Sequence, residues 1–283
     1  MTKDTIYRPL TATPFRHSSS YREFLPSPPL APYIRCFWCG TYPASSAGAD
    51  LLSTIVIPDT CADIIFQIDH TDQRVHAGFC GVSDQCMFSY GGMEGHEISL
   101  FAIRFYAWSA YLFSEDSLEG TLNGYSDIGE RFHWLEDALR GRLTDHFSPI
   151  DPFSLTELIR YTERLLLKRL EDARHHAVTE DAVSCLLLHR GACGISRLAK
   201  ECFVSTRQLE RLFHEYIGVT PGKLARLIRY QCLWQDIVYR PDFDIQDAVF
   251  RYGYTDQAHL MREFKRCHSM SIRCAKQLAG SCR

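Results

Sequence analysis

Two six-residue segments in the last third of the sequence share one pattern of residue types. Residues 208–213 and 259–264 each have Leu second, Arg fourth and Phe sixth. On a helix, the Leu and the Phe four residues later lie on one face, so they predict a buried side. The Arg between them points away from that side, and Arg commonly pairs with guanine. One such segment could arise by chance, whereas two in matched register indicate a repeated DNA-contacting unit.

The side chains predicted on the outward faces of these segments suit contacts to bases and phosphates. Arg pairs with guanine, Gln with adenine and Glu with the cytosine amino group, while Ala or Met contacts the thymine methyl group. Charged faces are usually only solvated, but the duplication favours DNA. We therefore predict DNA contacts by Thr206, Arg207, Glu210, Arg211 and His214 in the first unit and by Gln257, Ala258, Met261 and Arg262 in the second. Phosphate contacts are predicted for Arg229, Lys265 and Arg266, and these position the protein without specifying sequence.

Other residue groupings do not complete a catalytic or metal site. Cys36 and Cys39 form a C-x-x-C motif, but on a strand they point to opposite faces, which predicts buried free thiols. His96 and Glu97 begin the zinc motif H-E-x-x-H, where Leu100 replaces the second His. No phosphate-binding or dinucleotide-binding glycine motif occurs. We therefore predict no enzyme activity, no metal and no cofactor.

Turn and cap signals predict how the duplicated segments are positioned. Helices are expected at residues 179–189 with Thr179 as N-cap, at 194–202, at 205–217, at 221–238, at 245–252 and at 256–266. Ser205 and Gln208 form a capping box. Two short helices joined by a tight turn describe a helix-turn-helix, and the helix at 221–238 joins two of them. At 1.5 Å per residue, that helix is of the right order to separate them by about one DNA turn, ~34 Å.

The first half of the sequence predicts β-structure followed by helices. Short strand-type segments occur at residues 34–38, 53–57, 63–68, 74–79, 83–89 and 97–105, a spacing typical of a sandwich or barrel. Helices are expected at 108–113, at 128–143 and from Pro152 to about residue 173. The last of these carries an apolar stripe formed by Leu155, Leu158, Ile159, Leu165, Leu166 and Leu170. The stripe fits a helix packed on the barrel or a contact between two copies, and both interpretations stay open.

Length and charge bound the possible classes of protein. The chain has 283 residues, 46% of them hydrophobic, which suits about two globular domains. Residues 178–283 carry a net charge of +5 and residues 1–177 a net charge of −8, so the second part is the one suited to a polyanion. No apolar run approaches the ~20 residues of a membrane span, and the first ten residues do not resemble a signal peptide. We expect a cytoplasmic protein, without membrane association, whose 12 cysteines are free thiols.

The last hundred residues resemble the AraC/XylS family of bacterial transcription regulators. The matching residues are Leu198 and Ala199; Ser205, Leu209, Arg211 and Phe213; Gly218 to Pro221 with Arg226 and Arg229; and Gly253, Tyr254, Asp256, Gln257, His259, Arg262, Phe264, Lys265 and Arg266. The family usually continues with Gly-x-Ser/Thr-Pro, where this chain has Ser269-Met270-Ser271-Ile272. Leu233 stands at a position that is commonly Ala. The resemblance implies binding to double-stranded DNA, with RNA polymerase as a candidate partner.

The first half is similar, more loosely, to the sensor domain of one branch of that family. The similarity lies at Tyr33 to Trp38, at Ile57 to Phe66 and at Arg104 and Phe105. It implies a cupin-like β-barrel with helices that often dimerise. Strand-type segments also carry much aromatic bulk, which suits a pocket or a filled core. We predict a small organic effector held without a metal by Trp38, Asp59, Asp63, Phe66, His96 and Arg104.

Together these features predict an α+β protein with an N-terminal cupin-like β-barrel domain and trailing helices at residues 1–173, a linker at 174–178 and an all-α domain of two helix-turn-helix units at 179–283. The predicted function is that of a homodimeric, sequence-specific DNA-binding transcription regulator controlled by a small-molecule effector. The alternative is a regulator that senses thiol oxidation or metal through its cysteines. The sequence names neither the effector, the operator nor the sign of regulation.

Overall fold

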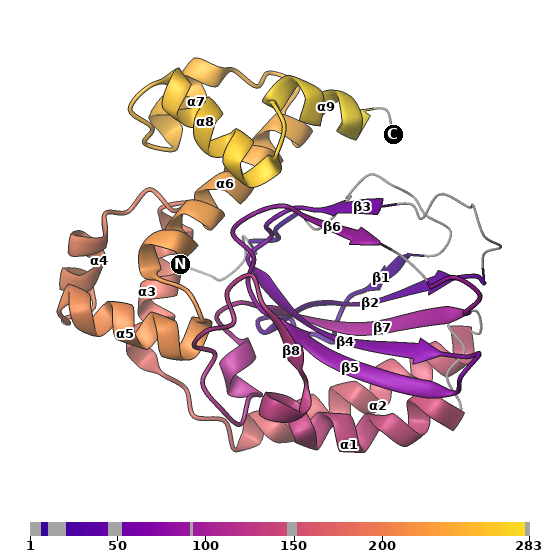
Figure 1. Ribbon diagram of the computed structural model, residues 1–283. Coiled ribbons are helices and arrows are strands. Elements are labelled where there is room, and N and C mark those ends of the chain that lie inside the picture. The colour runs from indigo at the N-terminus through magenta and orange to yellow at the C-terminus, as the bar shows by residue number, and fades with distance from the viewer. Residues whose placement is uncertain (1–6, 11–20, 45–52, 91–92, 146–151, 281–283) are drawn as a thin grey trace.

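The computed structural model describes residues 7–10, 21–44, 53–90, 93–145 and 152–280. Antiparallel β-sheet forms the N-terminal part, two helices follow it, and the C-terminal part is helical (Figure 1). The α+β fold class is therefore confirmed. None of the helices in the described part of the chain combines the length and the apolar character that crossing a bilayer requires.

The larger sheet has six strands in the order β1-β2-β7-β4-β5-β8, and each neighbouring pair is antiparallel. Its strands are Arg22–Phe24 (β1), Ile34–Tyr42 (β2), Cys61–Asp69 (β4), Arg74–Cys80 (β5), Ile98–Tyr106 (β7) and Tyr125–Asp127 (β8). Two further strands, Ser53–Val56 (β3) and Met87–Tyr90 (β6), form a separate two-stranded sheet. Strands β2, β3, β4, β5, β6 and β7 correspond to predicted segments, whereas β1 and β8 were not predicted.

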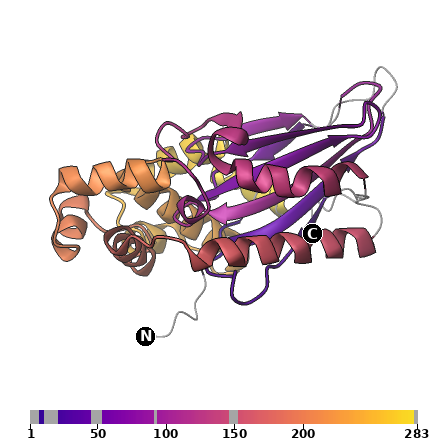
Figure 2. The same ribbon diagram turned by 90° about the horizontal axis from the view of Figure 1, so that it is seen from below.

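One face of the larger sheet is covered by helices α1 (Gly129–Asp145) and α2 (Pro152–Glu171) (Figure 2). The opposite face is the one on the side of β3 and β6 (Figure 1). Strand alternation sends neighbouring residues of β2 to these two faces. Phe37 and Cys39 belong to the core beneath the helices, while Cys36 and Trp38 pack on the other face with Ala102. The prediction that Cys36 and Cys39 point apart is confirmed.

The predicted aromatic bulk fills the layer between the sheet and its two helices. The side chains of Phe37, Phe66, Phe79, Phe101 and Phe105 are each at most 1% exposed and belong to one cluster with residues of α1 and α2. Phe66 and Phe101 lie stacked with their ring centroids 6.3 Å apart. These rings therefore form the domain core, which is one of the two alternatives left open above, and the predicted effector contact of Phe66 is wrong.

The apolar stripe of α2 packs inside its own domain. Leu155, Leu158, Ile159 and Leu166 are at most 9% exposed and belong to the same core cluster as the sheet residues. Of the two interpretations of this stripe, the structure therefore supports intradomain packing. The helix expected at residues 108–113 is reduced to one 3₁₀ turn, η1 (Ala110–Leu112).

The C-terminal part contains two helix-turn-helix units that share one helix. Its helices are Ala177–Leu188 (α3), Ile195–Glu201 (α4), Thr206–Ile217 (α5), Pro221–Tyr239 (α6), Ile245–Arg251 (α7), Gln257–His268 (α8) and Ile272–Gly280 (α9). The first unit is α4 and α5, the second is α7 and α8, and α6 runs from one to the other (Figure 1). Residues of α6 contribute to the cores of both units, Leu224 and Ile228 to the first and Trp234 and Ile237 to the second.

The two units repeat each other in their helix caps. Ser205 begins α5 and Asp256 begins α8, each by accepting a hydrogen bond from a backbone N–H three residues later. Gly218 ends α5 with φ +80°, and Ser269 ends α8 with φ +59°. Ser269 therefore takes the left-handed conformation that Gly adopts more easily. The two helices end in the same backbone conformation although Ser stands in one unit and Gly in the other.

Helix α3 begins earlier than predicted. Its N-cap is His176, whose Nδ1 accepts a hydrogen bond from the backbone N–H of Thr179 at 3.3 Å. Thr179 is buried within the first turn, so its prediction as the N-cap is wrong. The error has a local cause, because His is not among the residues that usually signal a helix start.

The N-terminal part contacts both helix-turn-helix units and the helix between them. Three polar contacts illustrate this: the Leu118 N–H donates to the Glu215 carbonyl in α5 at 2.9 Å, Asp84 pairs with Lys223 in α6 at 2.8 Å, and the Cys86 thiol donates to the Cys267 carbonyl in α8 at 3.1 Å. The two parts are joined by these contacts as well as by the connecting chain.

Candidate nucleic-acid interface

Helix α5 presents an apolar face to the protein and a polar face to solvent. The Ser205 hydroxyl accepts the Gln208 N–H at 3.1 Å and fixes where the helix starts. Leu209, Leu212 and Phe213 are at most 4% exposed. The predicted contact residues Thr206, Arg207, Glu210 and Arg211 are all exposed, and His214 is half-buried.

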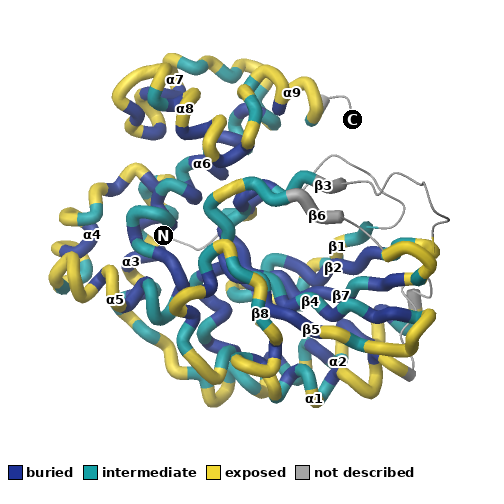
Figure 3. The backbone as a smooth tube through the Cα atoms, in the orientation of Figure 1, coloured by how far each residue is buried: buried dark blue, intermediate teal, exposed yellow. Residues whose placement is uncertain are grey.

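Helix α8 has the same organisation. Leu260 and Phe264 are buried, as the shared pattern predicts. The predicted contact residues are all exposed, namely Gln257, Ala258, Met261, Arg262, Lys265 and Arg266. Exposed residues dominate the outer sides of α4, α5, α7 and α8 (Figure 3). Both candidate recognition helices therefore offer polar, solvent-accessible side chains.

Helix α6 sets the separation of the two units. It has 19 residues, which corresponds to ~28 Å along its axis. Helix α5 packs near its start and α8 near its end, as the two core clusters show. This length is of the same order as one turn of B-DNA, ~34 Å, the spacing between successive major grooves on one side of a duplex.

Arg229 is the one predicted DNA-contacting residue that the structure assigns to the protein interior. Its guanidinium forms an ion pair with Glu263, with Nη2 2.8 Å from Oε2 and Nε 3.1 Å from Oε1. It also lies over the ring of Tyr254, whose hydroxyl donates to the same carboxylate at 3.0 Å. The side chains of Arg229 and Glu263 are 14% and 7% exposed. The predicted phosphate contact is therefore corrected to a tie between α6 and α8.

A buried histidine completes the core of the second unit. His268 Nδ1 and the Tyr230 hydroxyl oxygen are hydrogen-bonded at 2.8 Å. Its ring stacks on Phe264 and meets Trp234 edge-on. Burial lowers the pKa of His268 to about 4, so the imidazole is neutral in the folded protein at neutral pH.

Four of the six predicted effector residues meet on the face of the larger sheet opposite α1 and α2. Arg104 of β7 is paired with Asp63 of β4, with Nε 2.8 Å from Oδ1 and Nη2 2.8 Å from Oδ2. Arg104 Nη1 lies 3.5 Å from Asp59 Oδ2, and the Trp38 indole N–H donates to Asp63 at 3.2 Å. Register explains the central pair, because Asp63 and Arg104 are directly opposite in neighbouring strands.

This cluster contains a polar atom with unused hydrogen-bonding capacity. Arg104 Nη1 is buried and makes no hydrogen bond within the described structure, and the side chain is 5% exposed. Burial raises the pKa of Asp59 to about 6, while the nearby Arg104 acts in the opposite direction. Buried donors are normally satisfied, so this N–H group is available to a water molecule or to a hydrogen-bond acceptor of a ligand.

The other two predicted effector residues lie elsewhere. Phe66 is in the core on the opposite face of the sheet. His96 forms an isolated β-bridge with Met93 before β7, and its Nδ1 lies 2.7 Å from Asp69 Oδ2 at the end of β4. Neither side chain joins Arg104. A cavity of about 630 Å³ beside α5 and the linker includes none of the six residues.

The thiols on the sheet are poorly suited to redox sensing. Cys36, Cys39 and Cys61 are free and buried. Burial raises the pKa of Cys36 to about 12 and raises the pKa values of Cys39 and Cys61 as well. The thiolate is the reactive form, so the raised pKa values disfavour reaction of these three side chains.

Two side-chain groups in the described residues have metal-ligating chemistry that the sequence reasoning missed. One is Cys185, His189 and Glu201, and the other is Asp69, Asp72 and His96. The spacing of Cys185 and His189, four residues apart in a predicted helix, was the available signal for the first group. The second group is explained by its turn, because the Asp69 carboxylate accepts the backbone N–H groups of Thr71 and Asp72.

Residues 198–277 match the family described as "Helix-turn-helix domain", and residues 22–123 match "Domain of unknown function (DUF6597)". No curated protein matches the chain. Among solved structures, a transcriptional regulator with an AraC-type DNA-binding domain from Chromobacterium violaceum is 23% identical, covering 35% of this chain and 89% of its own, with a TM-score of 0.33. ToxT from Vibrio cholerae is 13% identical, covering 86% of this chain and 98% of its own, with a TM-score of 0.41. A ToxT complex with (E)-4-(8-methylnaphthalen-1-yl)but-3-enoic acid is 12% identical, covering 86% and 99%, with a TM-score of 0.41. These structural likenesses are weak.

Proposed function

We propose that this chain is a sequence-specific DNA-binding transcription regulator that places α5 and α8 in successive major grooves. The match of residues 198–277 to a helix-turn-helix domain supports DNA binding. The observation that carries the proposal is the repetition of one exposed polar face on two helices held by α6. In the first groove, Arg207, Glu210 and Arg211 reach base edges, with Thr206 and His214 beside them. In the second, Gln257, Ala258, Met261 and Arg262 do so, while Lys265 and Arg266 hold phosphates.

The test of this interface is DNA binding by the full chain with single substitutions. Arg211→Ala and Arg262→Ala should each weaken specific binding by about 1–3 kcal/mol. Lys265→Ala should instead weaken binding to all sequences. It should also reduce the slope of log affinity against log salt concentration by about one, because one phosphate contact is lost. The matched control is Arg160→Ala, which removes an exposed Arg from α2 in the other part of the chain. If Arg211→Ala and Arg262→Ala both keep wild-type selectivity against competitor DNA, the interface is wrong.

We further propose that a small organic effector binds at Arg104 and Trp38. Three features support this: the unsatisfied Nη1 of Arg104, the indole beside it, and half-buried apolar residues such as Ile65 and Leu100 on the same face. An effector that suits them has a hydrogen-bond acceptor for Arg104 and an apolar part for Trp38. The proposed sensing domain is residues 1–173, followed by a linker at 174–178 and the DNA-binding domain at 179–283.

A buried contact offers a route from this cluster to the DNA-binding part. Asp59 follows Pro58, and the Pro58 carbonyl accepts a hydrogen bond from the Gln231 side chain in α6. Gln231 is fully buried and also pairs with the backbone of Leu10, accepting its N–H at 2.8 Å and donating to its carbonyl at 3.1 Å. A ligand that moves Asp59 therefore changes the position of Pro58 and, through Gln231, of helix α6, which separates α5 from α8.

A thermal-shift screen of metabolites against the full chain tests the effector. An effector bound only by the folded protein raises its stability by about 2.7 kcal/mol at one hundred times its dissociation constant. The shift should be lost in Arg104→Lys, which keeps the charge but not the forked donors, and retained in Arg74→Lys, an exposed position on the same sheet. A stabilising compound that acts equally on Arg104→Lys would place the effector elsewhere.

Gln231→Leu tests the route separately. The substitution leaves the Leu10 N–H and the Pro58 carbonyl without this partner but removes no group from the cluster or from α5 and α8. We expect the effector to bind and the DNA to bind, with the effect of one on the other reduced. An unchanged effector response would show that the signal takes another path.

A further inference from the structure

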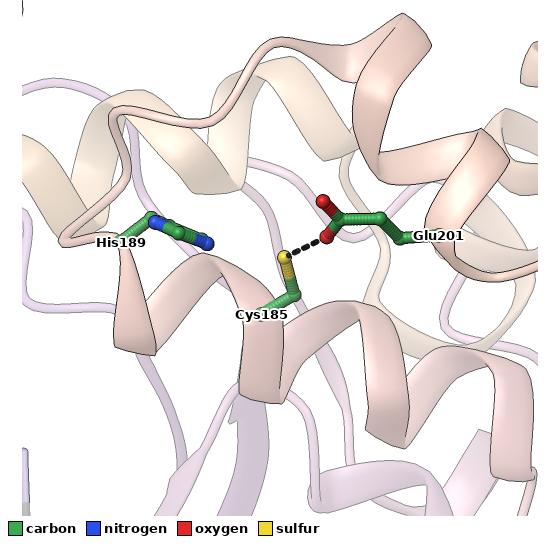
Figure 4. Close-up of side chains that lie close together, drawn as sticks. All are labelled: Cys185, His189 and Glu201. Atoms are coloured by element: carbon green, nitrogen blue, oxygen red, sulfur yellow. Dashed lines mark hydrogen bonds between the residues drawn. The ribbon is translucent and has the colours of Figure 1, made fainter.

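Three side chains with metal-ligating groups meet at the first helix-turn-helix unit (Figure 4). Cys185 lies in α3, and His189 is the C-cap residue of that helix. Glu201 is the last residue of α4. One ligand atom from each lies within 4.8 Å of the other two. The Cys185 thiol donates to Glu201 Oε2 at 3.0 Å, and Figure 4 shows the imidazole approaching the sulfur from the other side.

The helix geometry brings these groups together. Residues four apart in a helix share a face, so Cys185 and His189 point the same way from α3. Helix α4 packs against α3 and places Glu201 opposite them. Ligand atoms around a tetrahedral zinc ion are ~3.5 Å apart, given bonds of about 2.0–2.3 Å. The ligand atoms therefore have to approach one another by only ~1 Å. The side chains of half-exposed His189 and exposed Glu201 can do this by rotation about their own bonds, while the helices stay in place.

The surroundings favour a metal ligand role for Glu201. Arg197, one turn earlier in α4, binds the other carboxylate oxygen, with Nε 2.7 Å from Oε1. This contact orients the carboxylate so that Oε2 faces the sulfur, which is how outer residues commonly hold a metal ligand.

We infer that Cys185, His189 and Glu201 bind one divalent cation that prefers sulfur and nitrogen ligands, with Zn²⁺ the best match. One thiolate, one imidazole and one carboxylate are all ordinary zinc ligands, whereas Mg²⁺ and Ca²⁺ prefer oxygen alone. On binding, the Cys185 thiol releases its proton to solvent and a sulfur–metal bond replaces the S–H bond. The ion then links α3 to the end of α4, just before the turn into α5.

The second unit offers a natural contrast. Its first helix, α7, ends in Arg251 where α4 ends in Glu201. Arg251 pairs there with Asp236 of α6, with Nη1 2.6 Å from Oδ2, so a guanidinium takes the place that the Glu201 carboxylate has in the first unit. The metal therefore acts on the first unit alone and adjusts the placement of α5 relative to α8.

Cobalt binding to the full chain tests this inference. The protein is prepared with reductant and chelator, freed of both, and titrated with Co²⁺, whose bond to a thiolate gives a charge-transfer absorption. We expect one Co²⁺ per chain with this absorption, and its loss when Zn²⁺ is added. Cys185→Ser and His189→Gln should each weaken binding by more than ~100-fold, and Arg197→Ala by about tenfold.

Cys202→Ser is the matched control, because it removes a half-buried thiol next to Glu201 that is outside the ligand set. It should bind Co²⁺ like the wild type. Circular dichroism establishes that each variant is folded, and the metal-free variants should still bind DNA, which separates this inference from the proposed function. A wild type without the thiolate absorption, or a folded Cys185→Ser variant with wild-type affinity, would overturn the site.

Discussion

Replacing Arg229 by Ala distinguishes a structural tie from a DNA contact. In the structure, its guanidinium makes three hydrogen bonds of 2.8–3.1 Å to Glu263, and neither side chain is more than 14% exposed. Arg229→Ala leaves Glu263 buried with the Tyr254 hydroxyl as a remaining partner. Removing one member of a buried pair costs about 3–5 kcal/mol. The Tyr254 hydroxyl still donates to Glu263, so we expect the lower end of this range, about 3 kcal/mol.

The assay is hydrogen exchange of the α8 amides in the full chain, since a chain of several domains does not unfold in one step. A loss of about 3 kcal/mol lowers protection of α8 by roughly two orders of magnitude. Arg226→Ala, one turn earlier in α6, is the control and should change protection by less than threefold. Replacing both Arg229 and Glu263 by Met should recover most of the loss, because no buried charge is left unpaired.

The contrary result is equally specific. If Arg229 contacts a phosphate, Arg229→Ala leaves the protection of α8 unchanged. The variant then reduces the slope of log DNA affinity against log salt concentration by about one. That outcome would refute the structural role and restore the prediction made from motif position.

Three further predictions concern stability. Leu158→Glu should unfold the β-sheet part and lower the melting temperature, with no specific loss of dimer, because it buries a charge in the core. Glu157→Gln, at an exposed position, should leave the melting temperature unchanged. A folded monomer of Leu158→Glu from a dimeric wild type would contradict this. The pKa of His268 is about 4 in the folded protein, below its ordinary value of 6.5, so the unfolded chain binds the proton first as pH falls. The free energy of unfolding should therefore fall between pH 6.5 and pH 4, by up to ~3 kcal/mol. His268→Gln should remove this pH dependence, and an equal slope in the variant would refute the prediction. Ser269→Gly should raise the melting temperature, because it relieves ~1 kcal/mol of strain in the left-handed backbone of Ser269. This gain exceeds the free-energy cost of the greater flexibility that Gly gives the unfolded chain. A lower melting temperature would refute the prediction.

The helix-turn-helix units were predictable because their signals are local. The Ser205 cap, the Leu and Phe spacing and the turn at Gly253 each act within a few residues, and the observed helices differ from prediction by one or two residues. Strands β2, β4 and β7 were predictable for the same reason, since long runs of β-branched and aromatic residues indicate strands.

What the sequence did not supply depends on partners far along the chain. The three-residue strands β1 and β8 exist through pairing with β2 and β5 and carry no period of their own. Arg229 could be placed at a phosphate or at a carboxylate until the position of Glu263 was known. Asp63 and Arg104 meet through strand register, and that same register sends Phe66 to the opposite face, which composition alone cannot distinguish.

Selection of binding sites from random duplex DNA by the full-length protein tests the central claim most directly. The wild type should select a motif with two preferred segments centred about one helical turn apart, ~10 base pairs. Arg211→Ala should lose preference in one segment and Arg262→Ala in the other, while Arg160→Ala should select the wild-type motif. A single preferred segment, or loss of the same positions in both variants, would contradict recognition by two helices in successive grooves.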